Sequence, residues 1–372
     1  MERLGLVGLP NSGKSSLFNA LTGANAVVAS HPFSTTETTV GIAQVPDERL
    51  WKLAEMAESR KVVPAGVEFV DIAALAKGAS TGEGLGNRFL GSLREVDALV
   101  YVLRAFEDQS VMTATGSDPD PADDLATLEF ELVLADLAAV QGRIHRQGKA
   151  ARGDKSILPE IAALERAQSF LDEGIPLYRA GMSAEERDLL KASFLLTTKP
   201  ILIVVNIGED QLDEAAKLAE PFSSERLTPP VSGGHPPAPG DALAVSVQLE
   251  AEAARLDPEE RSELLEGLGL GDGVVPRVAR AAYHLLGRRT FLTTGPDESR
   301  AWTFRAGAKA PECAGVIHSD LQRGFIRAEV IRWDELLSIG SWNRAKEQGK
   351  LRVEGKEYEV ADGDVLEIRF NV

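Results

Sequence analysis

The 372-residue sequence predicts an α/β protein with a doubly wound parallel sheet, an inserted helical hairpin and a separate small β-rich domain. Three observations support this prediction. Short β-branched runs alternate with helical stretches through the first 285 residues, which is typical of a parallel sheet covered by helices. The alternation stops between about Asp118 and Thr198, and strands dominate again after about Leu286.

Six runs are the expected strands of the sheet. Several are almost continuously apolar, as strands buried on both faces of a parallel sheet must be. The runs are Arg3–Val7, Val40–Val45, Val67–Val70, Ala98–Leu103, Ile201–Asn206 and Leu243–Val247. A doubly wound sheet binds its ligands at the carboxyl ends of its strands, so we expect the functional residues there.

Helical periodicity fills the gap between the fourth and fifth strands. Apolar residues recur at helical spacing over 125–140 and again over 157–171, and the polar stretch Gly142–Asp154 between them predicts the turn of a hairpin. After Leu286, the expected strands are Ala301–Arg305, Gly324–Ile331 and Val365–Phe370.

The composition limits the class of protein. The sequence lacks an apolar run long enough to span a membrane, and its start does not resemble a signal peptide. Cys313 is the single cysteine, which excludes an intrachain disulfide and indicates a reducing cytosol. The net charge of −17 argues on its face against a nucleic-acid partner, because binding phosphates needs a cationic surface.

A phosphate-binding loop follows the first strand. Gly8–Ser15 fits G-x-x-x-x-G-K-[ST], and a helical run begins directly after it. Glycines let the backbone amides converge on phosphates, and the helix N-terminus adds its dipole. We expect Lys14 on the β- and γ-phosphates and the Ser15 hydroxyl on Mg²⁺. The expected nucleotide contacts of this loop are Asn11, Ser12, Gly13, Lys14, Ser15 and Ser16.

Two further segments are expected to complete the phosphate site. A threonine in the polar segment His31–Thr36 is expected to reach Mg²⁺ and the γ-phosphate. Asp71 ends an apolar strand, which is the Walker B arrangement that holds Mg²⁺ directly or through water. The glycine-rich stretch Lys77–Asn87 that follows is expected to be a switch loop.

The base-reading segment is the tetrapeptide Asn206-Ile207-Gly208-Glu209, after the strand Ile201–Asn206. GTPases carry Asn-Lys-x-Asp here, and their aspartate accepts two hydrogen bonds from guanine. Ile207 and Glu209 replace that lysine and aspartate, while Asn206 remains able to serve the N6 amine of adenine. The tetrapeptide therefore favours adenine.

These residues together resemble the YchF family, the Obg-like ATPases among the translation-factor class of P-loop proteins. The resemblance covers nearly the whole chain, and it rests on these stretches: GLPNSGKSS, HPFSTTETTVG, DIAALAKGASTGEGLGNRFL, NIGE, RAWTFRAGAKAPECAGVIHSD, GFIRAEVI and EGKEYEVADGDVLEIRFNV. It implies a P-loop nucleotide-binding domain over 1–117 and 199–285, a helical insertion over 118–198, and a ubiquitin-like β-grasp (TGS) domain over 286–372. It also implies binding and hydrolysis of ATP in preference to GTP, Mg²⁺ on Ser15 and Thr35, and association with ribosomes.

The sequence departs from the family at three places near the phosphates. Ala74 replaces a glycine whose amide normally meets the γ-phosphate, and Thr113 aligns with a histidine thought to assist hydrolysis. Threonine cannot act as a general base near neutral pH. Ser34 replaces a cysteine that is common in the family, which excludes redox control at that position. Leu75 stands where many GTPases hold a water-orienting glutamine, and this apolar substitution is shared by the family.

The resemblance changes how the net charge is interpreted. Residues 206–272 carry 15 acidic and 4 basic residues, whereas 286–372 carry 14 of each. The acidity therefore predicts which face avoids RNA and does not exclude a ribosome. The hairpin turn, 142–155, holds five cations and one acid, and both a solvated turn and a contact with RNA phosphates remain open for it.

The sequence thus predicts a cytosolic, Mg²⁺-dependent ATPase with slow turnover, catalysed through Lys14, Thr35 and Asp71, that acts as a ribosome-associated switch in translation or stress response. The expected partners are ATP and ribosomal RNA and proteins, with no DNA or membrane partner, and the chain is expected to be a monomer. Two alternatives remain: a non-hydrolysing nucleotide-binding adaptor, motivated by Ala74 and Thr113, and an Obg-type GTPase in ribosome assembly.

Overall fold

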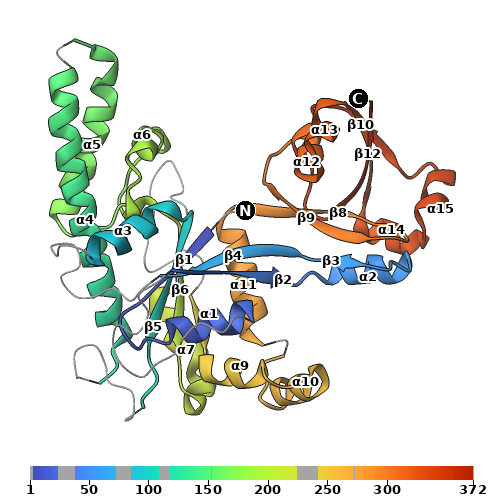
Figure 1. Ribbon diagram of the computed structural model, residues 1–372, viewed down its shortest axis with the longest axis horizontal. Coiled ribbons are helices and arrows are strands. Elements are labelled where there is room, and N and C mark those ends of the chain that lie inside the picture. Colours follow the sequence, from blue (N-terminus) through green and yellow to red (C-terminus); the bar gives the residue numbers. More distant parts are fainter. Residues whose placement is uncertain are drawn as a thin grey trace. The chain divides into compact units, whose positions relative to one another are not determined.

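The computed structural model describes residues 3–23, 38–72, 85–108, 118–151, 153–223, 242–271 and 273–371. Contacts between residues divide the chain into two compact units. The first unit comprises Met1–Ala43 and Glu68–Leu285, and the second comprises Gln44–Val67 and Leu286–Val372. Each unit is built around a sheet (Figure 1).

The first sheet has the strand order β2-β4-β1-β5-β6-β7. From β4 to β7, neighbouring strands pair in parallel, which confirms the doubly wound parallel sheet. The strands are β1 (Arg3–Val7), β2 (Thr39–Val45), β4 (Ala65–Asp71), β5 (Ala98–Arg104), β6 (Ile201–Asn206) and β7 (Leu243–Val245). Helices α1 (Lys14–Thr22), α3 (Leu85–Glu95), α7 (Ala215–Ala219), α9 (Val247–Ala253), α10 (Pro258–Gly267) and α11 (Val274–Leu285) belong to the same unit.

The last predicted strand of this sheet is shorter than expected. It was expected to run to Val247, but β7 ends at Val245 and Val247 begins α9. The physical reason is a cap: the Asn206 side-chain oxygen accepts a hydrogen bond from the Val247 amide at 3.2 Å. This bond satisfies one of the amides that the first turn of a helix leaves without a partner.

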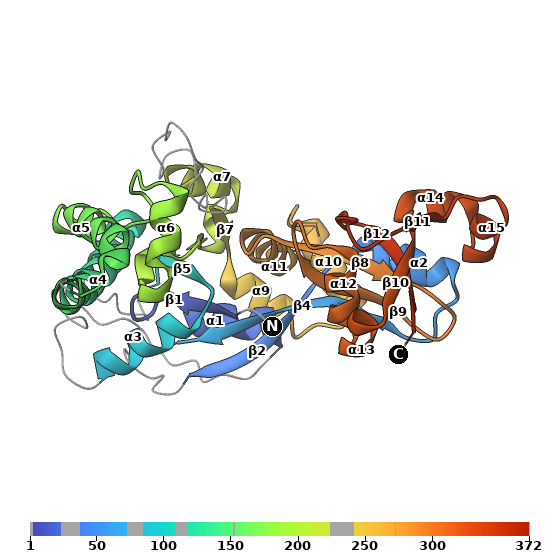
Figure 2. The same cartoon turned by 90° about the horizontal axis from the view of Figure 1, so that it is seen from above.

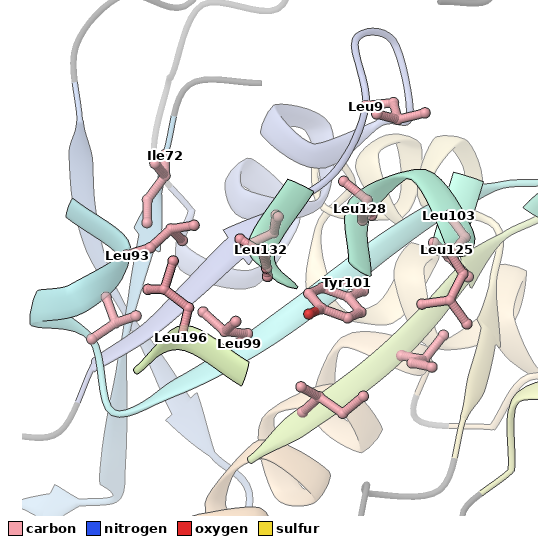
Figure 3. Close-up of a cluster of buried hydrophobic side chains, with 14 of the residues drawn as sticks. Leu9, Ile72, Leu93, Leu99, Tyr101, Leu103, Leu125, Leu128, Leu132 and Leu196 are labelled. Carbon is pink, nitrogen blue, oxygen red and sulfur yellow. The ribbon is translucent and has the colours of Figure 1, made fainter. Parts of the chain in front are cut away.

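The core of the first unit lies on the central strands, where β5 and β6 bury every residue. Figure 3 shows one face of β5, with Leu99, Tyr101 and Leu103 packed beside Leu128 and Leu132 of α4 (Pro121–Ala150). Such burial removes the strand from water on both faces and holds its carboxyl end in a fixed position.

The helical hairpin consists of α4 and α5 (Leu158–Asp172), which lie side by side (Figures 1 and 2). The turn is tighter than the predicted Gly142–Asp154, because α4 continues to Ala150 and a short 3₁₀ turn, Lys155–Ile157, precedes α5. Arg143 and Gln147, one helical turn apart, both bind Glu160 of α5 at 2.8 and 2.9 Å, and this pairing requires the helical spacing. The chain then returns to β6 through α6 (Ala184–Leu190) and 3₁₀ turns at Lys191–Ser193 and Leu196–Thr198.

The second unit holds a mixed sheet of order β11-β10-β12-β8-β9-β3, which is the predicted β-grasp arrangement. Its strands are β3 (Val62–Val63), β8 (Arg288–Thr293), β9 (Ser299–Arg305), β10 (Phe325–Arg332), β11 (Arg352–Glu354) and β12 (Asp364–Phe370). Its helices are α2 (Glu48–Met56), α12 (Ala310–Ile317), α13 (Ser319–Arg323), α14 (Trp333–Ile339) and α15 (Trp342–Glu347).

The segment 44–67 packs with the C-terminal residues, whereas the sequence placed it with the nucleotide-binding domain. β3 pairs in parallel with the start of β9, and Arg49 of α2 binds Asp362 at 2.6 Å. The other oxygen of Asp362 accepts a hydrogen bond from the Thr290 amide at 2.8 Å. The β3–β9 pairing and the Arg49–Asp362 contact join residues more than 200 positions apart, which no local pattern reveals.

Among the described helices, none has both the length and the apolar content needed to cross a bilayer.

Candidate nucleotide-binding site

The loop between β1 and α1 has the backbone form that its glycines permit. Asn11 and Gly13 lie in the left-handed region, with φ of 62° and 91°. A Cβ at Gly13 would overlap the Asn206 side-chain nitrogen, and one at Gly8 would lie 2.8 Å from the Val102 carbonyl oxygen. Any side chain at either position would displace the loop, so both motif glycines are needed for its shape.

Lys14 and Asp71 form a buried ion pair below this loop. The Lys14 ammonium donates to the Asp71 carboxylate at 3.0 Å, and the two side chains are 6% and 0% exposed. Register places Asp71 beside Leu6, two residues before the loop begins. The second carboxylate oxygen of Asp71 has no hydrogen-bond partner among the described residues. Lys14, which is expected to bind the phosphates, is thus paired with Asp71, which is expected to bind Mg²⁺.

Asn206 connects the base-reading segment to the phosphate loop. Its side-chain nitrogen donates to the Ser12 carbonyl at 3.0 Å, and its oxygen accepts from Val247. Its main-chain carbonyl accepts from the amides of Ala105 and Phe106 at 2.8 and 3.1 Å. The Asn206 side-chain amide therefore already bonds to the phosphate loop and to α9, and contact with adenine through it remains a prediction.

A pocket of about 470 Å³ lies between these segments. Gly13 and Ser16 line it from the phosphate loop and α1. One wall is Phe106–Asp108 after β5, and another is Asn206–Asp210 after β6. The remaining lining comes from α9 and the turn after it: Val247, Gln248, Ala251, Glu252 and Arg255.

The predicted base-reading residues take different positions in this pocket. Ile207 is buried, with 2% of its surface exposed, and its amide donates to the Val245 carbonyl at 2.9 Å. Glu209 is exposed at the start of a 3₁₀ turn, Glu209–Glu214. The pocket thus offers an apolar side chain at the position where GTPases carry lysine.

Most predicted site residues gather at the carboxyl ends of the strands. They are Asn11, Ser12, Gly13, Lys14, Ser15 and Ser16 from the phosphate loop and α1, Asp71 from β4, and Asn206, Ile207 and Glu209 from β6 and the segment after it. Thr35 lies outside the described residues, as do Ser34, Ala74, Leu75 and Thr113. The roles assigned to all of these residues remain predictions.

Two walls of the pocket were not predicted from the sequence. Phe106–Asp108 follows β5 directly, so the rule that ligands sit at carboxyl strand ends could have located it. The α9 wall is not predicted, because the apolar run 243–247 has the pattern of one strand, whereas β7 ends at Val245 and α9 begins at Val247. Ser246, between β7 and α9, is buried, and its hydroxyl has no partner among the described residues.

The oxygen donors at the site fit a small hard cation held together with a phosphate. The Ser15 hydroxyl and the Asp71 carboxylate are ligand types that Mg²⁺ accepts, and Asp71 retains a buried oxygen without a described partner. The described residues include no group of three His, Cys, Asp or Glu side chains able to hold a metal alone.

An acidic residue under the pocket wall has an unusual titration. Asp124, in the first turn of α4, accepts a hydrogen bond from the Arg104 amide at 3.2 Å. Burial raises the pKa of the Asp124 carboxyl to about 6, although that hydrogen bond lowers it.

Comparisons with known proteins cover the whole chain. Residues 3–129 match the family model MMR_HSR1, "50S ribosome-binding GTPase", and residues 289–371 match YchF-GTPase_C, "Protein of unknown function (DUF933)". The chain is 44% identical to "Ribosome-binding ATPase YchF" of Bacillus subtilis (strain 168), covering 99% of both chains. It is 42% identical to the protein of that name from Escherichia coli O157:H7, covering 100% of this chain and 99% of the relative.

A solved structure is similar over the same extent. The Schizosaccharomyces pombe YchF GTPase superimposes with a TM-score of 0.82 at 32% identity, covering 99% of this chain and 97% of that one.

Proposed function

The chain belongs to the YchF family, and on that premise we propose that it binds ATP with Mg²⁺, hydrolyses it slowly and associates with the ribosome. The observation that carries the proposal is the pocket that joins the phosphate loop to the base-reading segment. Gly13 and Ser16 line the pocket from the phosphate loop and α1, and Phe106 and Ile207 line it from the segments after β5 and β6. These two kinds of lining suit a nucleoside triphosphate, with phosphates on the loop and a purine between the walls.

Nucleotide binding requires a change of partner for Lys14. Its ammonium must leave Asp71 to reach the β- and γ-phosphates, where the loop amides and the start of α1 also favour negative charge. Ser15 and Asp71 would hold Mg²⁺, with Thr35 as a further expected ligand. The ion, when bound, neutralises charge on the β- and γ-oxygens.

Base selection follows from the wall residues. Ile207 and Phe106 present apolar surface to the pocket, and this suits the faces of a purine ring. Glu209 replaces the aspartate that reads guanine, which favours adenine and supports ATP as the ligand.

The helical hairpin is the proposed contact with the ribosome. Arg146, Lys149 and Lys155 are exposed at its tip, whereas Arg143 is held by Glu160 at 2.6 Å. Exposed cations at the tip of a long hairpin can bind RNA phosphates without bringing the acidic residues of 206–272 into contact with them. A cytosolic location and a role in translation or stress response complete the proposal.

Calorimetry with non-hydrolysable ATP and GTP analogues, with Mg²⁺ and then with EDTA, tests the binding site. We expect tighter binding of the ATP analogue and weaker binding in EDTA. Tighter binding of the GTP analogue would instead support an Obg-type GTPase.

Single-turnover hydrolysis with and without ribosomes tests the activity. We expect slow release of phosphate that ribosomes accelerate. A complete lack of phosphate release in both conditions would leave a nucleotide-binding adaptor as the better description.

A further inference from the structure

We propose that Arg104 and Gln211, two residues that do not line the nucleotide pocket, act as positioning residues that fix the distance between its two base-facing walls. The proposal rests on the proposed nucleotide function, because it concerns how the same pocket selects its base. The walls are Phe106–Asp108 and Asn206–Asp210.

Arg104 holds the first wall from below. It is the last residue of β5 and is 4% exposed. Its guanidinium donates to the carbonyl oxygens of Phe106 and Asp108 at 3.2 and 3.4 Å. It also lies 4.4 Å from the centre of the Phe106 ring, which is a cation–π distance. A single side chain thus fixes both ends of the wall and one face of its aromatic ring.

Gln211 connects the first wall to the second. Its side-chain nitrogen donates to the Ala105 carbonyl at 3.3 Å, and its side-chain oxygen accepts from the Gly208 amide at 2.8 Å. Gly208 stands between Ile207 and Glu209, so this amide lies in the middle of the base-reading segment. The Asn206 carbonyl closes the connection by accepting from Ala105 and Phe106.

The geometry has a consequence for specificity. A purine between two walls is discriminated only if the walls keep their separation, since a site that relaxes adapts to either base. Arg104 fixes the wall that contains Phe106, and Gln211 links that wall to Gly208 in the other wall. Loss of either should weaken discrimination between ATP and GTP more than it weakens binding of the shared triphosphate.

The chain supplies a matched control. Arg187 is also partly buried, and its guanidinium donates to two carbonyls of one loop, those of Met182 and Ala180, at 3.2 and 2.9 Å. It lies in α6 and lines no part of the pocket. Arg187→Lys therefore removes the same kind of interaction from a different place.

The first experiment needs no nucleotide. Hydrogen exchange in the full-length protein measures the amides of Ala105 and Phe106, which bond to Asn206. We expect about tenfold faster exchange in Arg104→Lys and in Gln211→Leu, and no change in Arg187→Lys, since one hydrogen bond accounts for about a factor of ten. Unchanged exchange in the first two variants would overturn the proposal, whatever the wild-type protein binds.

The second experiment measures the dissociation constants of non-hydrolysable ATP and GTP analogues for the same variants, beside their Tm values. We expect the ratio of the two constants to move about tenfold toward one in Arg104→Lys and Gln211→Leu, and the double variant to add little. A residue that only stabilises the fold would lower Tm and weaken both analogues equally, which would refute the inference. A wild-type preference for the GTP analogue would overturn the proposed base choice, while a change in the ratio would still support the two positioning residues.

Discussion

Replacing Lys14 by methionine should destabilise the protein even in the absence of any nucleotide. The side chain is buried against Asp71 at 3.0 Å, and Asp71 is 0% exposed. Removal of one partner leaves a buried carboxylate without compensation, which costs about 3–5 kcal/mol. For a unit of this size, about 2–4 °C of Tm per kcal/mol gives a decrease of about 6–20 °C.

Calorimetry of the nucleotide-free protein is the appropriate assay. All four tryptophans, Trp51, Trp302, Trp333 and Trp342, belong to the second unit, so their fluorescence does not report on the site. A control is Lys191→Met, which breaks an exposed pair with Asp188 and should change stability by less than about 1 kcal/mol.

The double variant Lys14→Met/Asp71→Asn separates charge from packing. Removing both charges should recover most of the lost stability, because no uncompensated ion remains. If Lys14→Met and wild type melt at the same temperature without nucleotide, the pair does not stabilise the fold and the reasoning is wrong.

Three further outcomes are expected. Gly13→Ala should abolish nucleotide binding, because the added Cβ would overlap Asn206. Gly23→Ala is the control and should retain binding, because Gly23 also has a positive φ, 64°, but has open space around it. Equal binding of an ATP analogue by both variants in calorimetry would contradict this reasoning. Burial raises the pKa of Glu129 to about 7 from 4.5, so the folded state holds the proton more tightly and its stability falls as pH rises from about 4.5 to about 7. The Tm should therefore decrease over that interval in wild type and decrease less in Glu129→Gln, and parallel profiles would exclude Glu129 as the cause. Charge reversal of Arg146 and Lys149 should weaken ribosome binding and its dependence on salt, as measured by co-sedimentation across a salt series; an unchanged slope would remove the hairpin tip from the proposed interface.

Local features of the sequence were sufficient to predict the central sheet. β1 and β6 occupy the predicted residues because continuous apolar runs dictate buried strands. The phosphate loop was equally predictable, since its glycines are required by backbone geometry that the motif encodes.

Features that depend on distant partners were not predictable in this way. The pairing of Lys14 with Asp71 joins residues 57 positions apart, and each side chain was assigned to a ligand rather than to the other. The wall Phe106–Asp108 carries no motif of its own and becomes part of the site only because β5 ends beside β6. Both cases show that the sheet order, rather than the motif, decides which side chains meet.

The docking of 44–67 onto the C-terminal residues determines when this protein can finish folding during its synthesis. Arg49 and Asp362 are 313 residues apart, and at about 5–20 residues per second this interval lasts about 15–60 s. Throughout it, the apolar residues of α2, Leu50, Leu53 and Ala54, lack the packing partners that later bury them. The segment between β2 and β4, which contains α2, is therefore exposed while the rest of the first sheet is synthesised, and it needs protection from aggregation during that time.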